Sequence, residues 1–160
     1  MTEPQEDGPS PRDQILAARE KLRMLILGLA NYLSHQFRAE NGLIRHELQA
    51  KTQSPSPKSF SAMDQALALR ALVRASQDLR NDIYPWEAVD ILFSMNKELF
   101  DQAAGFYRSE GEPQLTPWAL TQTLRALEAV RAHVPPTSQK QIDRIQAPWL
   151  ERVQNWRLRP

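Results

Sequence analysis

The sequence contains no cysteine and only five glycines among its 160 residues. Without cysteine the chain has no disulfide, no thiolate ligand for a metal ion and no thiol nucleophile. The glycines, at positions 8, 28, 42, 105 and 111, are too far apart to form a glycine-rich loop that cradles phosphate. The absence of cysteine fits a reducing compartment, and we therefore expect a cytoplasmic protein.

An excess of charge of one sign is also missing, because 20 Lys and Arg stand against 19 Asp and Glu. This balance gives no bulk attraction to nucleic acid or to a membrane surface. The most apolar stretch, residues 22–33, is too short to span a bilayer and contains Arg23 and Asn31. The polar, acidic N-terminus does not resemble a signal peptide. We expect no membrane association.

What the chain does have is the composition of an ordinary globular domain, with 41% hydrophobic and 24% charged residues. Its length suits one domain that buries a core without cross-links. Fifteen of the 20 basic residues are arginine, which favours planar, bidentate pairing with carboxylates.

Three Pro-Trp pairs occur in the second half of the chain, at Pro85-Trp86, Pro117-Trp118 and Pro148-Trp149. Proline suits the first position of a helix, where its missing N–H is not needed. The adjacent tryptophan could place a large ring on a neighbouring helix. We interpret the pairs as a recurring helix start, although Pro148 lies inside an apolar pattern that continues past it and therefore predicts a kink or a tight junction.

Helical periodicity is strongest near the N-terminus, where Ser10 can cap a helix that begins at Pro11. Steps of three and four residues place one set of apolar side chains on a single face of this helix: Ile15, Ala18, Leu22, Leu25, Ile26, Leu29, Leu33 and Phe37. Met24 and Leu27 widen that face, so the sequence predicts a central helix contacted on several sides.

The remaining periodic segments predict helices over about 61–80, 85–108, 116–134 and 137–156, and no segment alternates like a strand. The predicted fold is therefore all-α, a single-domain bundle of about five helices with a long central N-terminal helix. Residues 1–9 are expected to form a flexible acidic tail, 10–156 the bundle, 52–60 a Ser/Pro-rich loop within it, and 157–160 a basic C-terminal tail. We also expect the acidic third helix to face basic residues of the second or fourth.

No pattern of residues predicts an enzyme, a cofactor or a metal site. The three histidines, at positions 35, 46 and 133, match no metal-binding motif. Paired carboxylates occur at Glu87/Asp90 and Glu98/Asp101, but their spacing places them on the polar face of the third helix. The sequence thus predicts no catalytic residue.

The main functional hypothesis is a non-enzymatic protein–protein interaction module: an adaptor, an assembly factor or a regulator. Aromatic and arginine side chains are frequent anchors of interfaces. The candidate partner-binding residues form an apolar ridge with flanking arginines near the C-terminus: Trp149, Val153, Trp156, Arg152, Arg157 and Arg159. The partner is another protein or a second copy of the chain; burial of the ridge in the core is the competing interpretation.

The alternative hypothesis is a nucleic-acid-associated protein. Its candidate residues are four arginines of the second and fourth predicted helices, together with the Arg/Trp C-terminal segment: Arg70, Arg74, Arg125 and Arg131. Phosphate binding needs several such side chains on one surface. An exposed apolar patch would favour the first hypothesis, and converging arginines free of internal partners would favour the second.

Overall fold

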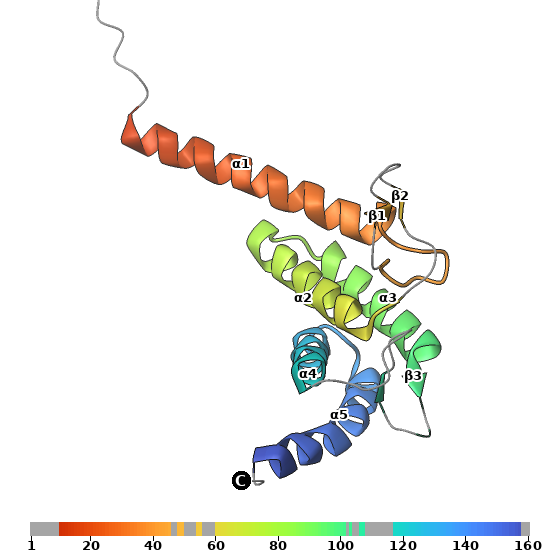
Figure 1. Cartoon of the computed structure of the whole chain (residues 1–160). Coiled ribbons are helices and arrows are strands. Elements are labelled where there is room, and N and C mark those ends of the chain that lie inside the picture. Colours follow the sequence, from red (N-terminus) through yellow and green to blue (C-terminus); the bar gives the residue numbers. More distant parts are fainter. Residues whose placement is uncertain are drawn as a thin grey trace, which may run out of the picture.

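The computed structural model describes residues 10–45, 48–49, 54–55, 60–101, 103, 106–107 and 117–157. Within them the chain forms five α-helices and two pairs of very short strands (Figure 1). The all-α prediction is confirmed. The predicted tail over 1–9 and the last residues of the predicted basic tail, 158–160, lie outside the described residues.

The helices appear in order as α1 (Pro11–Asn31), α2 (Ala62–Leu79), α3 (Ile83–Glu98), α4 (Pro117–Arg131) and α5 (Pro136–Arg157), and a π-helical turn, η1 (Tyr32–Gln36), extends α1. Strands β1 (Leu48–Gln49) and β2 (Ser54–Pro55) pair antiparallel, as do β3 (Phe100–Asp101) and β4 (Phe106–Tyr107). Two residues of the expected Ser/Pro-rich loop therefore belong to a strand; the others, except Phe60, lie outside the described residues.

Local sequence signals explain several helix boundaries. The Ser10 hydroxyl accepts a hydrogen bond from the Asp13 backbone N–H at 3.2 Å, which caps α1 as predicted. Pro117 is the first residue of α4. Pro85, in contrast, is the third residue of α3, and α5 continues through Pro148 without dividing. The Pro-Trp pair is thus a helix start at one of its three positions.

The centre of the fold is α2, which packs against α3 on one side and α4 on another, while α5 packs against α4 (Figure 1). Ten residues of α2 are buried, among them Leu69 and Leu72, which have no exposed surface. Burial of such side chains is the main favourable contribution to folding. The position expected for the N-terminal helix is therefore occupied by α2.

The prediction that α1 is central is wrong. Only Ala30 of its 21 residues is buried, and the helix lies along the edge of the molecule with its N-terminal half extending past α2 (Figure 1). Hydrophobic periodicity identifies a helix face that avoids water, but it does not say which surface covers that face. Here the core covers only part of that face, at residues such as Ile26, Leu33 and Phe37, and leaves others such as Ile15 and Leu25 exposed.

Candidate interaction surface

The C-terminal half of α1 is attached to the rest of the molecule by a few defined contacts. Ala30 is buried, while Ile26 and Leu27 pack partly against the core. The Asn31 side chain accepts a hydrogen bond from the Tyr84 hydroxyl at 2.8 Å, and the Arg23 guanidinium donates to the backbone oxygen of Leu79 at 3.4 Å. These contacts fix which side of α1 faces α2 and α3.

The segment after η1 is held just as specifically. Arg38 donates from Nε to the Gly42 backbone oxygen at 2.9 Å and forms an ion pair with Glu87 of α3 at 3.1 Å. Both charged side chains are about four-fifths buried, with 21% and 20% of their surface exposed. Glu87 of the acidic third helix therefore pairs with Arg38, and not with a base of the second or fourth helix as expected.

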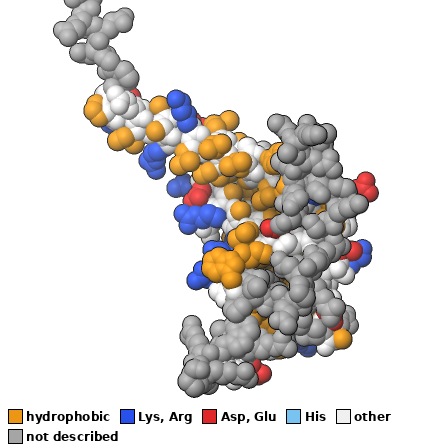
Figure 2. All heavy atoms as spheres, viewed as in Figure 1, with side chains coloured by type: hydrophobic (Ala, Val, Ile, Leu, Met, Phe, Trp, Pro, Cys, Tyr) orange, Lys and Arg blue, Asp and Glu red, His pale blue; other side chains and the backbone are white. Residues whose placement is uncertain are grey.

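A different side of α1 carries six apolar residues that remain exposed. We call them the α1 stripe: Ile15, Ala18, Leu22, Leu25, Leu29 and Tyr32. The large side chains among them are between 36% (Tyr32) and 61% (Ile15) exposed. Figure 2 shows hydrophobic side chains gathered along α1, with lysine and arginine between them. Such a continuous apolar surface on a folded chain is typical of an interaction site.

The spacing of the α1 stripe is that of a heptad repeat. Its members alternate steps of three and four residues from Ile15 to Tyr32. A repeat of 3.5 residues keeps a narrow seam on one side of a helix, which is the seam that a second helix contacts in a coiled coil. Met24, although equally exposed, lies outside this seam, roughly on the opposite side of the helix.

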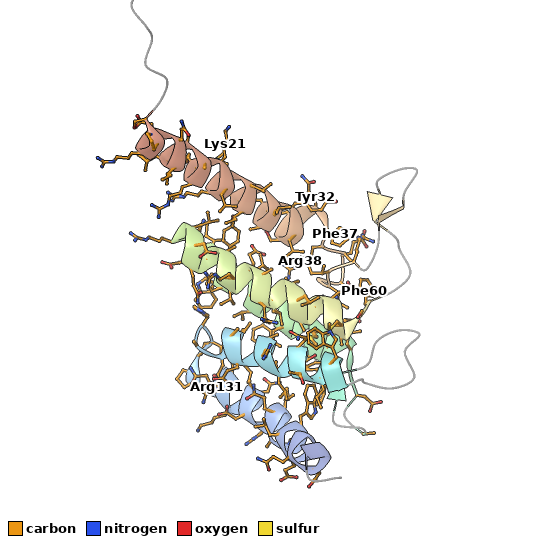
Figure 3. The ribbon with its side chains drawn as sticks, turned by 60° about the vertical axis from the view of Figure 1, so that its left-hand side comes forward. Lys21, Tyr32, Phe37, Arg38, Phe60 and Arg131 are labelled. Atoms are coloured by element: carbon orange, nitrogen blue, oxygen red, sulfur yellow. The ribbon has the colours of Figure 1, made fainter. Side chains whose placement is uncertain are left out.

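Basic side chains flank the α1 stripe. Arg19 lies on one side of it and Lys21 on the other, and Lys21 points away from the rest of the molecule (Figure 3). The two acidic residues of α1, Asp13 and Glu20, fall on the opposite side of the helix from the stripe. The surface is therefore an apolar seam with positive edges.

A groove opens between the N-terminal half of α1 and the C-terminal end of α2, with a volume of about 760 Å³. Four arginines line it, together with two acids: Arg19, Arg23, Arg74, Arg80, Glu20 and Asp78. Arg74 forms an ion pair with Asp78 at 3.1 Å, and Arg23 is directed at the end of α2. Because the carboxyl end of a helix is negative, these arginines partly serve to stabilise α2.

A smaller groove of about 290 Å³ lies at the other end of the α1 stripe. It is lined mainly by apolar side chains, including Leu33, Phe37 and Leu67, with Arg45 and Asp64 at its wall. The Nε of Arg45 is buried and has no hydrogen-bond partner among the described residues. Phe37 also stacks on Tyr32 of the stripe, with ring centroids 5.8 Å apart. The apolar surface thus continues from α1 onto α2.

The C-terminal ridge predicted from the sequence is not where the exposed apolar surface lies. Trp149 is 1% exposed and meets the Tyr107 ring edge-on at 5.5 Å, so in this structure it lies in the core, as the competing interpretation expects. The side chains of Val153, Trp156, Arg152 and Arg157 and the whole of Arg159 lie outside the described residues. The stripe on α1 was visible in the sequence, but was assigned to the core.

Three of the four arginines proposed for nucleic acid already have partners within the chain. Arg70 donates to the buried Gln122 side chain, Arg74 pairs with Asp78, and Arg131 forms a two-bond pair with Asp143 at 2.8 and 3.3 Å. Arg131 lowers the pKa of Asp143, mainly through the hydrogen bond. Arg125 is exposed on α4.

Among the residues that the structure describes, no three His, Asp or Glu side chains gather in a way that would hold a metal ion. Burial raises the pKa of the Tyr107 hydroxyl, which donates a hydrogen bond to the Asn96 side chain. None of the helices in this part of the chain combines the length and hydropathy that crossing a bilayer requires.

The chain matches no family profile, no curated protein sequence and no solved structure. Its function is therefore inferred from its own geometry.

Proposed function

We propose that this protein is a non-enzymatic, cytoplasmic protein–protein interaction module that binds its partner through the α1 stripe. The observation that supports this proposal is the exposure of a six-residue heptad seam on a helix attached to the body by another side. An adaptor, an assembly factor or a regulator would act through such a surface.

The energetics favour a partner over permanent exposure. Full burial of a leucine or isoleucine side chain contributes about 1.5–3 kcal/mol, and Leu22, Leu25 and Leu29 retain 57%, 58% and 60% of their surface. Each would therefore contribute about 1 kcal/mol or more when a partner covers it. A charge placed within the seam should weaken binding by at least about tenfold, since burying it costs more than the lost contact.

The seam also indicates the chemistry of the partner. A heptad seam about 18 residues long, from Ile15 to Tyr32, matches another amphipathic helix. The positive edges at Arg19 and Lys21 disfavour a partner with basic residues directly opposite, because like charges repel across a helix pair. The expected partner surface is an apolar helix face that offers neutral or acidic side chains to these two positions.

A capture experiment with matched variants tests the proposal. The full chain, Leu22→Glu and Met24→Glu are immobilised and exposed to cell extract, and the bound proteins are quantified by mass spectrometry. Leu22 and Met24 are both 57% exposed and lie two residues apart, but Leu22 lies in the seam, at the edge of the 760 Å³ groove, and Met24 lies in neither. The proposal requires proteins that Leu22→Glu loses and Met24→Glu retains; identical sets for all three baits would contradict it.

Nucleic-acid association is the second candidate, and the four-arginine groove between α1 and α2 is the observation that favours it. Binding there should fall steeply with salt, because phosphate contacts release counterions. Arg23→Ala and Arg80→Ala should each weaken retention on a single-stranded DNA column, while Met24→Glu, which lies outside the groove, should not. If neither arginine substitution changes retention on the column, this groove is not a nucleic-acid site.

A further inference from the structure

We infer that the partner of the α1 stripe is a second copy of this chain, whose α1 lies antiparallel to the first. This inference rests on the proposed function and specifies the partner. It is carried by the self-complementarity of the stripe, which is seen when the spacing, the sizes and the charges of its residues are compared under a two-fold axis.

The geometry of a two-fold pair follows from the spacing. The six stripe positions are symmetric about a point midway between Leu22 and Leu25. An antiparallel pair centred there places Leu22 against the partner's Leu25, and the opposite layer is generated by the same axis. An isologous contact of this kind closes on itself and gives a dimer.

The sizes of the side chains also match in this register. The large Leu29 meets the partner's small Ala18, and Ile15 meets the partner's Tyr32. Alternation of large and small residues across facing positions lets layers interdigitate without voids. The partner's Ile15 would lie at the end of α1 where the 290 Å³ apolar groove opens, so the seam is extended by Leu33 and Phe37.

The flanking residues avoid a clash of like charges in the same register. Arg19 comes to lie beside the partner's Ile26, and Lys21 beside the partner's Gly28. A side chain at Gly28 would meet nothing within 4 Å, so this position leaves room for the aliphatic stem of Lys21. The acidic residues of α1, Asp13 and Glu20, lie on the opposite side of the helix from the stripe in both copies and take no part in the seam.

The way α1 is attached to the body favours the antiparallel arrangement. Its contacts with α2 and α3 involve Arg23, Ala30 and Asn31, all in the C-terminal half or near the middle of the helix. In an antiparallel pair the two bodies lie at opposite ends. Each exposed N-terminal half then lies along the partner's attached half, whose stripe residues Leu29 and Tyr32 are accessible. A parallel pair would bring both bodies to one end.

Sedimentation velocity of the full chain tests the pairing. We expect a dimer whose population rises with concentration over roughly 1–100 µM. Leu22→Glu should raise the dissociation constant by at least about tenfold, since the layer formed with the partner's Leu25 occurs twice. Met24→Glu, equally exposed but outside the seam, should leave it unchanged. Far-ultraviolet circular dichroism checks that both variants keep their helix content.

The orientation is measured with a nitroxide spin label, because a chain without cysteine accepts a single engineered one. A label at Asp13→Cys lies on the outer side of α1. Residue 13 is 21 positions away from its symmetry mate along an antiparallel pair, which at 1.5 Å per residue predicts a distance of about 30 Å or more. In a parallel pair the two labels would lie level with each other, separated only by the width of the pair, and their distance would be clearly shorter than in the antiparallel pair, where the axial offset adds to that width.

The outcomes separate this inference from the proposed function. A chain that stays monomeric to about 100 µM, or a dimer that Leu22→Glu does not weaken, overturns the self-pairing. A short label distance overturns the antiparallel register. If the chain is monomeric yet loses a different protein on Leu22→Glu, the interaction module stands and its partner is not a second copy. If neither is seen, both proposals fail.

Discussion

The side chain of Gln65 clamps the backbone of Ile44. Its amide nitrogen donates to the Ile44 carbonyl and its amide oxygen accepts from the Ile44 N–H, both at 2.7 Å. Gln65 has no exposed surface and Ile44 is 2% exposed, so water does not compete for either bond. The clamp fixes the segment after η1 to the central helix, and with it the attached end of α1.

Gln65→Leu should destabilise the protein by about 2–4 kcal/mol, because it leaves a buried N–H and a buried carbonyl of Ile44 without partners. Urea denaturation monitored by circular dichroism measures the change. Gln77→Leu, on the exposed side of the same helix, is the matched control and should change stability by less than about 0.5 kcal/mol. Equal effects of the two substitutions would contradict the clamp.

Trp149→Ala should cost about 3–5 kcal/mol, because it opens a large cavity beside Tyr107 in the core. Trp118 is 63% exposed, and Trp118→Ala should cost less than about 1 kcal/mol. Chemical denaturation measures the free energy of unfolding of both variants and so tests whether Trp149 belongs to the core or to an interface. A stable Trp149→Ala variant that loses a binding partner would restore the C-terminal ridge as an interface.

Arg80→Gly should stabilise the protein by about 0.5–1 kcal/mol. Arg80 ends α2 with a φ of 52°, a left-handed conformation that costs a residue with a side chain more than it costs glycine. Arg80→Ala keeps the Cβ and removes the charge, so it should give no gain. If alanine stabilised as much as glycine, the loss of the charge beside Arg74 and Arg23 would be the cause instead of the backbone.

The Arg131–Asp143 pair should make a small contribution to stability that depends on pH. Arg131 holds the pKa of Asp143 below its ordinary value of 3.8. A carboxylate with a lowered pKa in the folded state stabilises the protein above its unfolded pKa, and that contribution is lost as the pH falls through the folded value. Asp143→Asn should therefore be less stable than the native chain at pH 7. The difference should disappear as the pH falls well below 3.8, as thermal denaturation across this range would show.

Local signals in the sequence predicted those helix ends that depend on a few neighbouring residues. Ser10 and Pro11 begin α1, and Pro117 begins α4, because capping and a fixed φ act within one turn. Pro148 was harder to interpret, since a helix held by tertiary packing on both sides of a proline continues through it. Trp149 is buried there while Trp86 and Trp118, in the same dipeptide, are exposed.

The candidate surface could be seen in the sequence, but its role could not. The periodicity from Ile15 to Leu29 predicted an apolar face, and that face exists. Whether the rest of the chain covers that face depends on which helix occupies the centre of the fold. Here α2 occupies the centre, because side chains such as Ala62, Ala66 and Leu69 allow close packing on two sides. The position of a helix in the fold depends on the packing of the whole chain, so the sequence of one segment does not predict it.

The N-terminal half of α1 has a dynamic consequence of its own. Residues 11–22 of α1 are all exposed, and a helical segment of about a dozen residues with little packing against the described part of the chain is marginal in water, so its amides should open often while those near Ala30 stay protected. The rate of backbone amide hydrogen exchange should therefore decrease along α1 from Gln14 toward Asn31. A partner bound to the α1 stripe would slow hydrogen exchange most in the N-terminal half of α1. The free-energy cost of ordering that half would then reduce the affinity of the complex.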